Sequence, residues 1–186
     1  MTLLLLLACV RGPVSQTGYD PIAEPAPAPA GALAPHVHTL EQLRASMPVG
    51  TVIRLRVRAA GAPEVEQRWE VTAADADGVT IASRVLGADG ALLKDEGAAV
   101  STWAELYAHA DFPADRTLVA PSSVDVPAGH FETVLYTVIG TPEEGGRDFV
   151  KQLHFAKDLP GPPVYFTIVD GKGTTLEMTL LERTPR

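Results

Sequence analysis

The sequence contains one cysteine, Cys9, among its 186 residues. A single cysteine cannot form an internal disulfide, so the fold must be stable without covalent cross-links even in an oxidising compartment. Basic residues are also scarce, because 15 Lys and Arg stand against 23 Asp and Glu for a formal net charge of -8. Nucleic-acid binding needs clustered Lys and Arg to neutralise phosphates, so this composition argues against a nucleic-acid partner.

Long apolar runs and catalytic motifs are missing as well. The leucines at residues 3–7, followed by Ala8 and Cys9, form a run far shorter than the ~20 residues that a membrane-spanning helix needs. The sequence has no GxSxG, GxxxxGK, HExxH or CxxC motif. We therefore predict no catalytic residues, no cofactor and no metal site, and we expect that the protein is not an enzyme.

The leucine run has the form of an export signal, which ends in small residues at a cleavage site. Residues 6–9, Leu-Leu-Ala-Cys, resemble the signal of bacterial lipoproteins. The resemblance implies that residues 1–8 are a signal peptide and that Cys9 carries a thioether-linked lipid that holds the protein at a membrane. Because Val10 and not Asp follows Cys9, it also implies an outer-membrane lipoprotein of the cell envelope, facing the periplasm or the surface. The alternative is an unprocessed apolar terminus in which Cys9 is an ordinary thiol.

Residues 9–38 form a segment rich in Pro and Ala, with prolines at 13, 21, 25, 27, 29 and 35 and no apolar periodicity. Such a composition cannot build a core and favours extended polyproline II conformations. We expect a disordered tether that joins the lipid to one folded domain, residues 39–186. His36 and His38 in this tether have the spacing of a metal-binding pair, but no third ligand is near in sequence.

Capping patterns predict two short helices in the domain. Thr39 and Gln42 match a capping box ahead of a short amphipathic stretch that ends before Pro48. Thr102 and Glu105 match a second one, at residues 101–107. Each helix is about two turns long, so the domain must owe most of its structure to other elements.

The rest of the domain follows the period of β-strands. Apolar residues alternate with three arginines in residues 53–59 and with acidic residues in residues 64–71. If these segments pair as a hairpin, the arginines face glutamates. Cross-strand ion pairs then account for the three arginines better than an anion-binding stripe does. Later strand-like segments end at Gly, Pro or Asp-Gly, most clearly at residues 170–173. The predicted fold is mainly β, a curled antiparallel meander that forms a half-barrel with two short helices.

Residues 130–140 and 163–170 are apolar on both faces of their strands. Such strands need cover on each side, which a filled core would provide. An apolar cavity inside a half-open barrel is the more specific interpretation. The candidate ligand-binding residues are then the aromatic side chains Trp69, Tyr136, Phe155, Tyr165 and Phe166.

The strings VDVPAGHFETVLYTV and HFAKDLPGPPVYF, with the closing hairpin, resemble exported bacterial proteins of unknown function and the curled sheets of lipoprotein-localisation (LolA/LolB-like) carriers. The resemblance covers about residues 120–184 and implies a curved sheet that encloses helices and a lipid-binding concavity. We expect a lipid-anchored envelope protein that binds an apolar small molecule or an envelope partner. The alternatives are a periplasmic hydrolase-like enzyme with His154 and Asp158 near its site, and a purely structural surface module.

Overall fold

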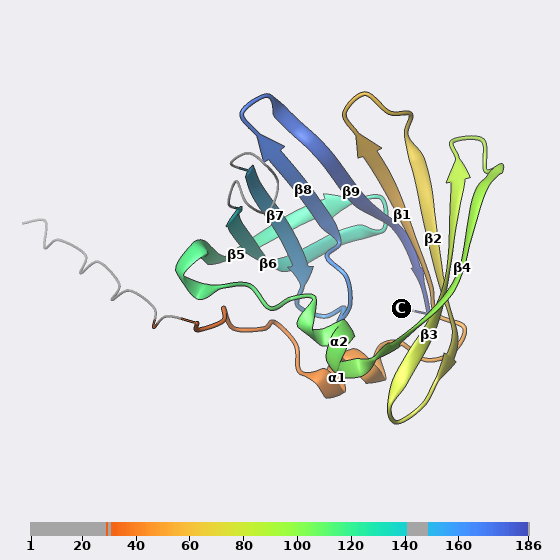
Figure 1. The fold of residues 1–186 in the computed structure, drawn as a ribbon, viewed down its shortest axis with the longest axis horizontal. Coiled ribbons are helices and arrows are strands. Elements are labelled where there is room, and N and C mark those ends of the chain that lie inside the picture. The colour runs from red at the N-terminus through yellow and green to blue at the C-terminus, as the bar shows by residue number, and fades with distance from the viewer. Residues whose placement is uncertain (1–28, 30, 141–148, 186) are drawn as a thin grey trace, which may run out of the picture.

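The computed structural model of the chain describes residues 29, 31–140 and 149–185 (Figure 1). Cys9, the predicted signal peptide and most of the predicted tether lie outside these residues. Among the helices that are described, none is both long and apolar enough to cross a membrane. The elements, in chain order, are α1 (Leu40–Ala45), β1 (Val52–Ala59), β2 (Val65–Ala74), β3 (Gly78–Gly87), β4 (Leu92–Thr102), α2 (Trp103–Ala108), the 3-10 helix η1 (Ala114–Arg116), β5 (Thr117–Val126), β6 (Gly129–Gly140), β7 (Phe149–Ala156), β8 (Tyr165–Asp170) and β9 (Gly173–Thr184).

The strands form a nine-stranded antiparallel sheet in the order β4-β3-β2-β1-β9-β8-β7-β6-β5. Two meanders, β1–β4 and β5–β9, are joined where β9 returns to pair with β1. The sheet is curled, and the β5–β6 hairpin passes behind β7–β9 until the Ala128 N–H meets the Leu180 carbonyl at 3.4 Å (Figure 1). Strands β4 and β5 remain as separate edges, so the sheet is not closed. These observations confirm the predicted fold class.

The predicted hairpin of residues 53–59 and 64–71 is β1 paired with β2. The Arg54 guanidinium donates to both carboxylate oxygens of Glu66 at 2.7 and 2.8 Å, and to Glu182 at 2.8 Å. The hydrogen bond from Arg54 lowers the pKa of Glu66. The cross-strand ion pairs are therefore confirmed, and they occupy one face of β1. On the other face Ile53 and Leu55 are fully buried in the core.

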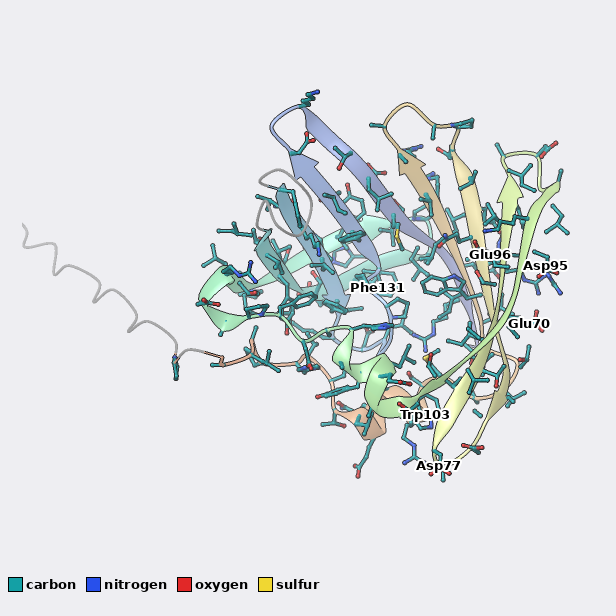
Figure 2. All side chains as sticks on the ribbon, viewed as in Figure 1. Glu70, Asp77, Asp95, Glu96, Trp103 and Phe131 are labelled. Carbon is teal, nitrogen blue, oxygen red and sulfur yellow. The ribbon has the colours of Figure 1, made fainter. Side chains whose placement is uncertain are left out.

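Both capping boxes are confirmed. Thr39 Oγ1 accepts the Gln42 N–H, and Thr102 Oγ1 accepts the Glu105 N–H. The second box turns the chain from β4 into α2 and buries Trp103, whose indole N–H donates to the Asp75 carbonyl at 2.9 Å. Trp103 therefore lies against the β2–β3 turn (Figure 2). The chain then runs from edge strand β4 to edge strand β5 through residues 103–116, across the open side of the sheet (Figure 1).

Residues 31–38, which we call the strap, pack on the domain. Leu33 forms a β-bridge with Pro113, and the Ala34 N–H donates to the Phe112 carbonyl at 2.8 Å. Ala34 is only 3% exposed. The sequence placed these residues in a disordered tether because they lack periodicity. Their backbone partners are about 80 residues away in the chain, so no local sequence pattern predicts this pairing.

Candidate functional site

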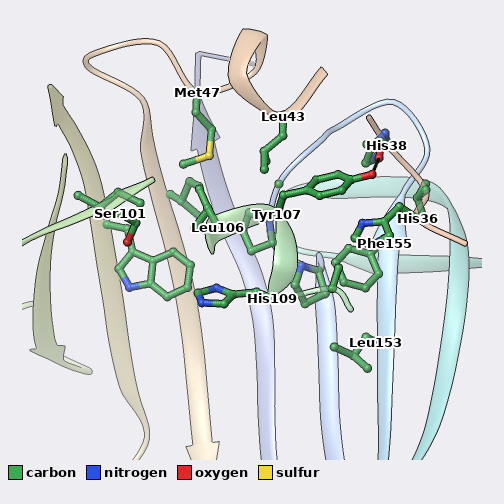
Figure 3. Close-up of a pocket in the computed structure, with 18 of the residues that line it drawn as sticks. His36, His38, Leu43, Met47, Ser101, Leu106, Tyr107, His109, Leu153 and Phe155 are labelled. Atoms are coloured by element: carbon green, nitrogen blue, oxygen red, sulfur yellow. Dashed lines mark hydrogen bonds between the residues drawn. The ribbon is translucent and has the colours of Figure 1, made fainter. Parts of the chain in front are cut away.

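A cavity of about 430 Å³ lies between the sheet, the two helices and the strap (Figure 3). This volume falls in the range typical of small-molecule sites. Most of the lining is apolar, and it is built from elements far apart in the sequence. The sheet contributes Ile53, Trp69, Ile81, Leu153, Phe155 and Met178, among others, while α1 and α2 and the residues after them contribute Leu43, Met47, Leu106, Tyr107, His109 and Ala110.

Three of the five aromatic candidates line this cavity: Trp69, Tyr136 and Phe155. Phe166 packs against the buried cluster that contains Tyr136 and Phe155, but it does not reach the cavity. Tyr165 lies on the opposite face of β8, because successive side chains of a strand alternate between faces. Its ring contacts that of His154, with centroids 5.7 Å apart. The structure thus brings three candidates together and separates Tyr165 from them.

The helices supply lining residues that were not among the candidates. Leu43 is buried in α1, and Met47 follows directly after its C-cap. Leu106 and Tyr107 reach the cavity from α2. The apolar face of each helix was visible in the sequence. The packing partners of these faces could not be predicted, because both helices also pack against residues that are far from them in the sequence.

Two tyrosine hydroxyls fasten the strap over the cavity. Tyr107 donates to the His38 carbonyl at 3.1 Å, and Tyr136 donates to the Pro35 carbonyl. Burial raises the pKa of Tyr136, so its hydroxyl stays protonated and able to donate. The Tyr136 ring also packs at an angle on Phe112 and Phe155, with centroids 5.7 and 5.4 Å away. The strap is consequently a wall of the cavity with side-chain attachments of its own.

His36 and His38 lie on the strap side of the cavity (Figure 3). His36 Nε2 is 2.7 Å from Asp111 Oδ1, and its ring stacks on Tyr107 with centroids 4.1 Å apart. His38 Nε2 donates to the Ala156 carbonyl at 2.7 Å. Within the described ranges, no three side chains of His, Cys, Asp or Glu gather in a group that could hold a metal ion. Both histidines act as further attachments of the strap.

A buried arginine holds the proline-rich loop at the cavity rim. Arg183 is 4% exposed, and it donates from Nη1 to the Pro160 carbonyl at 2.6 Å and from Nη2 to the Ser46 carbonyl. Burial lowers the pKa of this guanidinium. Arg183 thus connects the end of α1 to the loop of residues 160–163. The last three residues of this loop line the cavity. The rigid proline run therefore serves as a rim, and nothing local in the sequence marks Arg183 as its support.

The residues of the hydrolase alternative do not meet at the cavity. His154 lies on the face of β7 opposite to the lining residues Leu153 and Phe155. Its Nδ1 is 3.3 Å from Thr133 Oγ1, and burial lowers its pKa. Asp158 is exposed beyond the end of β7, and no contact joins it to His154 in the part of the chain that the structure describes. The two side chains form no acid–base pair here.

No protein-family model matches the chain, and a comparison with curated proteins also finds no match. The fold and cavity define a class nevertheless: a mainly β protein whose open, curled antiparallel sheet surrounds an apolar cavity.

Solved structures of similar fold include a candidate lipoprotein from Parabacteroides distasonis ATCC 8503, with a TM-score of 0.47 and 10% identity over 74% of this chain and 96% of that one. A candidate exported protein with a YmcC-like fold from Bacteroides fragilis NCTC 9343 has a TM-score of 0.46 and 14% identity over the same shares. MucB has a TM-score of 0.46 and 12% identity, over 78% of this chain and 56% of its own. None of the three is described as a LolA/LolB-like carrier, so that part of the sequence resemblance stays a prediction.

Proposed function

We propose that this chain is a lipid-anchored protein of the bacterial cell envelope whose domain binds an apolar molecule. The observation that carries the proposal is the cavity of about 430 Å³ with a largely apolar lining. Burial of apolar surface is favourable by ~25 cal/mol per Å², and this free energy would drive the binding of an apolar ligand in the cavity. In this proposal the protein binds the apolar molecule and does not catalyse a reaction.

The cavity is accessible from outside. Two of its lining residues, Ala99 on β4 and His109 after α2, are themselves exposed to solvent, which places the entrance on this side of the cavity. Other lining residues are buried in the core, since Met47, Ile53 and Tyr136 are each 3% exposed or less. A preformed apolar space with an entrance is typical of a binding site for one small molecule.

The proposal is tested by filling the cavity from its edge. Ala99 and Ala98 are neighbours on edge strand β4, and only Ala99 lines the cavity. We expect the full chain to bind the fluorescent apolar probe N-phenyl-1-naphthylamine saturably. Ala99→Trp should weaken this binding at least tenfold, because the indole takes the space of the probe. Ala98→Trp is the matched control, since it adds the same side chain on the opposite face of β4. Absence of saturable binding, or equal effects of both changes, would contradict a ligand in this cavity.

The anchor depends on Cys9, and Cys9→Ser tests it. In cells, wild-type protein should sediment with membranes, and its intact mass should exceed that of the polypeptide from Cys9 onward by the attached acyl groups. Cys9→Ser should leave the chain unmodified and in the soluble fraction, whereas Ser15→Ala in the same segment should change neither property. An outer-membrane position is supported by Val10 after the cysteine, and separation of the two membranes by density tests it. Wild-type protein with a free thiol in the soluble fraction would refute the anchor.

A further inference from the structure

The polar groups of the cavity lining are mostly occupied by the protein itself. The two strap histidines bind Asp111 and the Ala156 carbonyl, and the two tyrosine hydroxyls bind strap carbonyls. Ser83 donates to Glu96 at 3.1 Å. The three hydroxyl groups and the two histidine Nε2 atoms therefore cannot donate to a ligand unless a protein hydrogen bond breaks.

Three lining side chains are different. Ser101, His109 and the indole N–H of Trp69 have no hydrogen-bond partner within the described part of the chain, although all three residues line the cavity. Ser101 and His109 are also close to each other in the sequence. Ser101 is the last residue but one of β4, and His109 is the C-cap of α2. Because α2 begins directly after β4 and spans six residues, a helix of fewer than two turns joins the two groups. Figure 3 shows them together on the side of the cavity away from His36 and Phe155.

We infer that the ligand has a single apolar chain that ends in one oxygen-bearing polar group, and that this group binds between Ser101 and His109. The inference rests on the proposed function and specifies its ligand. The serine hydroxyl and the imidazole N–H can each donate a hydrogen bond to an oxygen of the ligand. The chain would extend from there over Trp69, Ile81 and Met178.

The volume of the cavity and the charges of its lining residues limit the class of ligand that can bind. A cavity of about 430 Å³ lies near the lower end of the range for small-molecule sites, which suits one chain better than a lipid with several. The lining residues include three histidines and no carboxylate. An ammonium group would find no carboxylate among the lining residues, so it would lack a charge-assisted hydrogen bond there. A carboxylate would find a partner in His109, and an alcohol would find two hydrogen bonds.

Displacement of N-phenyl-1-naphthylamine by three ligands of equal chain length tests the inference: decanoic acid, decanol and decylamine. With the full wild-type chain, the acid and the alcohol should displace the probe at roughly tenfold lower concentration than the amine. Ser101→Ala and His109→Leu should each reduce that preference about threefold to tenfold, the effect of one lost hydrogen bond. Ser123→Ala is the control, because Ser123 is exposed on β5 and does not line the cavity, and it should leave the preference unchanged.

The outcomes separate the two proposals. If the probe does not bind the wild-type chain, the proposed function fails. If the probe binds but decylamine displaces it as well as decanoic acid does, apolar binding stands and the polar end group is refuted. The same holds if Ser101→Ala and His109→Leu weaken all three ligands equally. The affinity of the probe itself reports whether each variant has kept its cavity.

Discussion

The strap should open when its two tyrosine attachments are removed. Tyr107→Phe and Tyr136→Phe each delete one hydroxyl and keep the ring, so the stacking on His36 and the packing on Phe155 persist. The hydroxyls donate to different carbonyls, those of His38 and Pro35. The double variant therefore removes two separate hydrogen bonds between the domain and the strap and leaves the apolar contacts in place.

The magnitude follows from the hydrogen bonds. A hydrogen bond of this kind contributes ~1 kcal/mol net, and a buried carbonyl left unsatisfied adds to the loss. The two losses should sum to ~2 kcal/mol if the sites are independent. Because ~1.4 kcal/mol corresponds to a factor of ten, the equilibrium between open and closed strap should shift by about 30-fold.

Amide hydrogen exchange measures this shift residue by residue. The Ala34 N–H bonds to the Phe112 carbonyl at 2.8 Å, and the Ala114 N–H bonds to the Ala32 carbonyl at 2.8 Å. Both bonds break when the strap leaves, so both amides should exchange about 30-fold faster in the double variant. The Leu180 N–H, which bonds to the Val164 carbonyl within the core at 2.8 Å, serves as the control.

Two results would refute the reasoning. Equal acceleration of Ala34 and Leu180 would mean that the variant loses global stability and that the strap has no separate opening. Unchanged exchange at Ala34 would mean that the backbone bonds and histidine contacts hold the strap without the hydroxyls. Each single variant should give about a fivefold acceleration, which checks that the two attachments act independently.

Two further predictions concern stability. Burial lowers the folded-state pKa of His154 below its usual 6.5, so the unfolded chain binds the proton first as the pH falls. Stability should therefore decline as the pH drops from ~7 through 6.5, and His154→Gln should flatten that part of a plot of urea midpoints against pH; an unchanged slope would contradict it. A Cβ at Gly78 would lie 2.5 Å from the Ser101 carbonyl oxygen, so Gly78→Ala should cost ~1–3 kcal/mol in urea unfolding. Gly171→Ala, with no atom within 4 Å, is the control, and equal midpoints would contradict the steric argument.

Patterns that act between near neighbours were sufficient to predict much of the fold. The capping boxes at Thr39 and Thr102 depend on residues three positions apart, and both form. The hairpin at residues 170–173 depends on the Asp-Gly turn between two alternating strands, and β8 pairs with β9 there. Two of the three arginines of β1, Arg54 and Arg58, were explained correctly by acidic residues across the hairpin. The third, Arg56, has a buried Nε with no hydrogen-bond partner among the described residues.

The site was harder to predict because it depends on contacts between distant segments. The strap has no periodicity, and its partners lie near residue 112 and on β6 and β7. The separation of Tyr165 from the cavity, in contrast, is predictable from the sequence. Tyr165 and Phe166 are adjacent on a strand, so alternation alone implies that they cannot face the same cavity.

The helices and the strap that cover the cavity are weaker structures than the sheet behind it. Helices of six residues, such as α1 and α2, are not stable alone in water and depend on packing of their apolar faces. Those faces, with Leu43 and Leu106, are the ones that line the cavity. A ligand that fills the space supplies contacts that the empty cavity lacks, and it binds only the folded arrangement. Occupancy should therefore stabilise α1, α2 and the strap more than the strand pairs, because the backbone hydrogen bonds of the sheet form whether or not the cavity is filled.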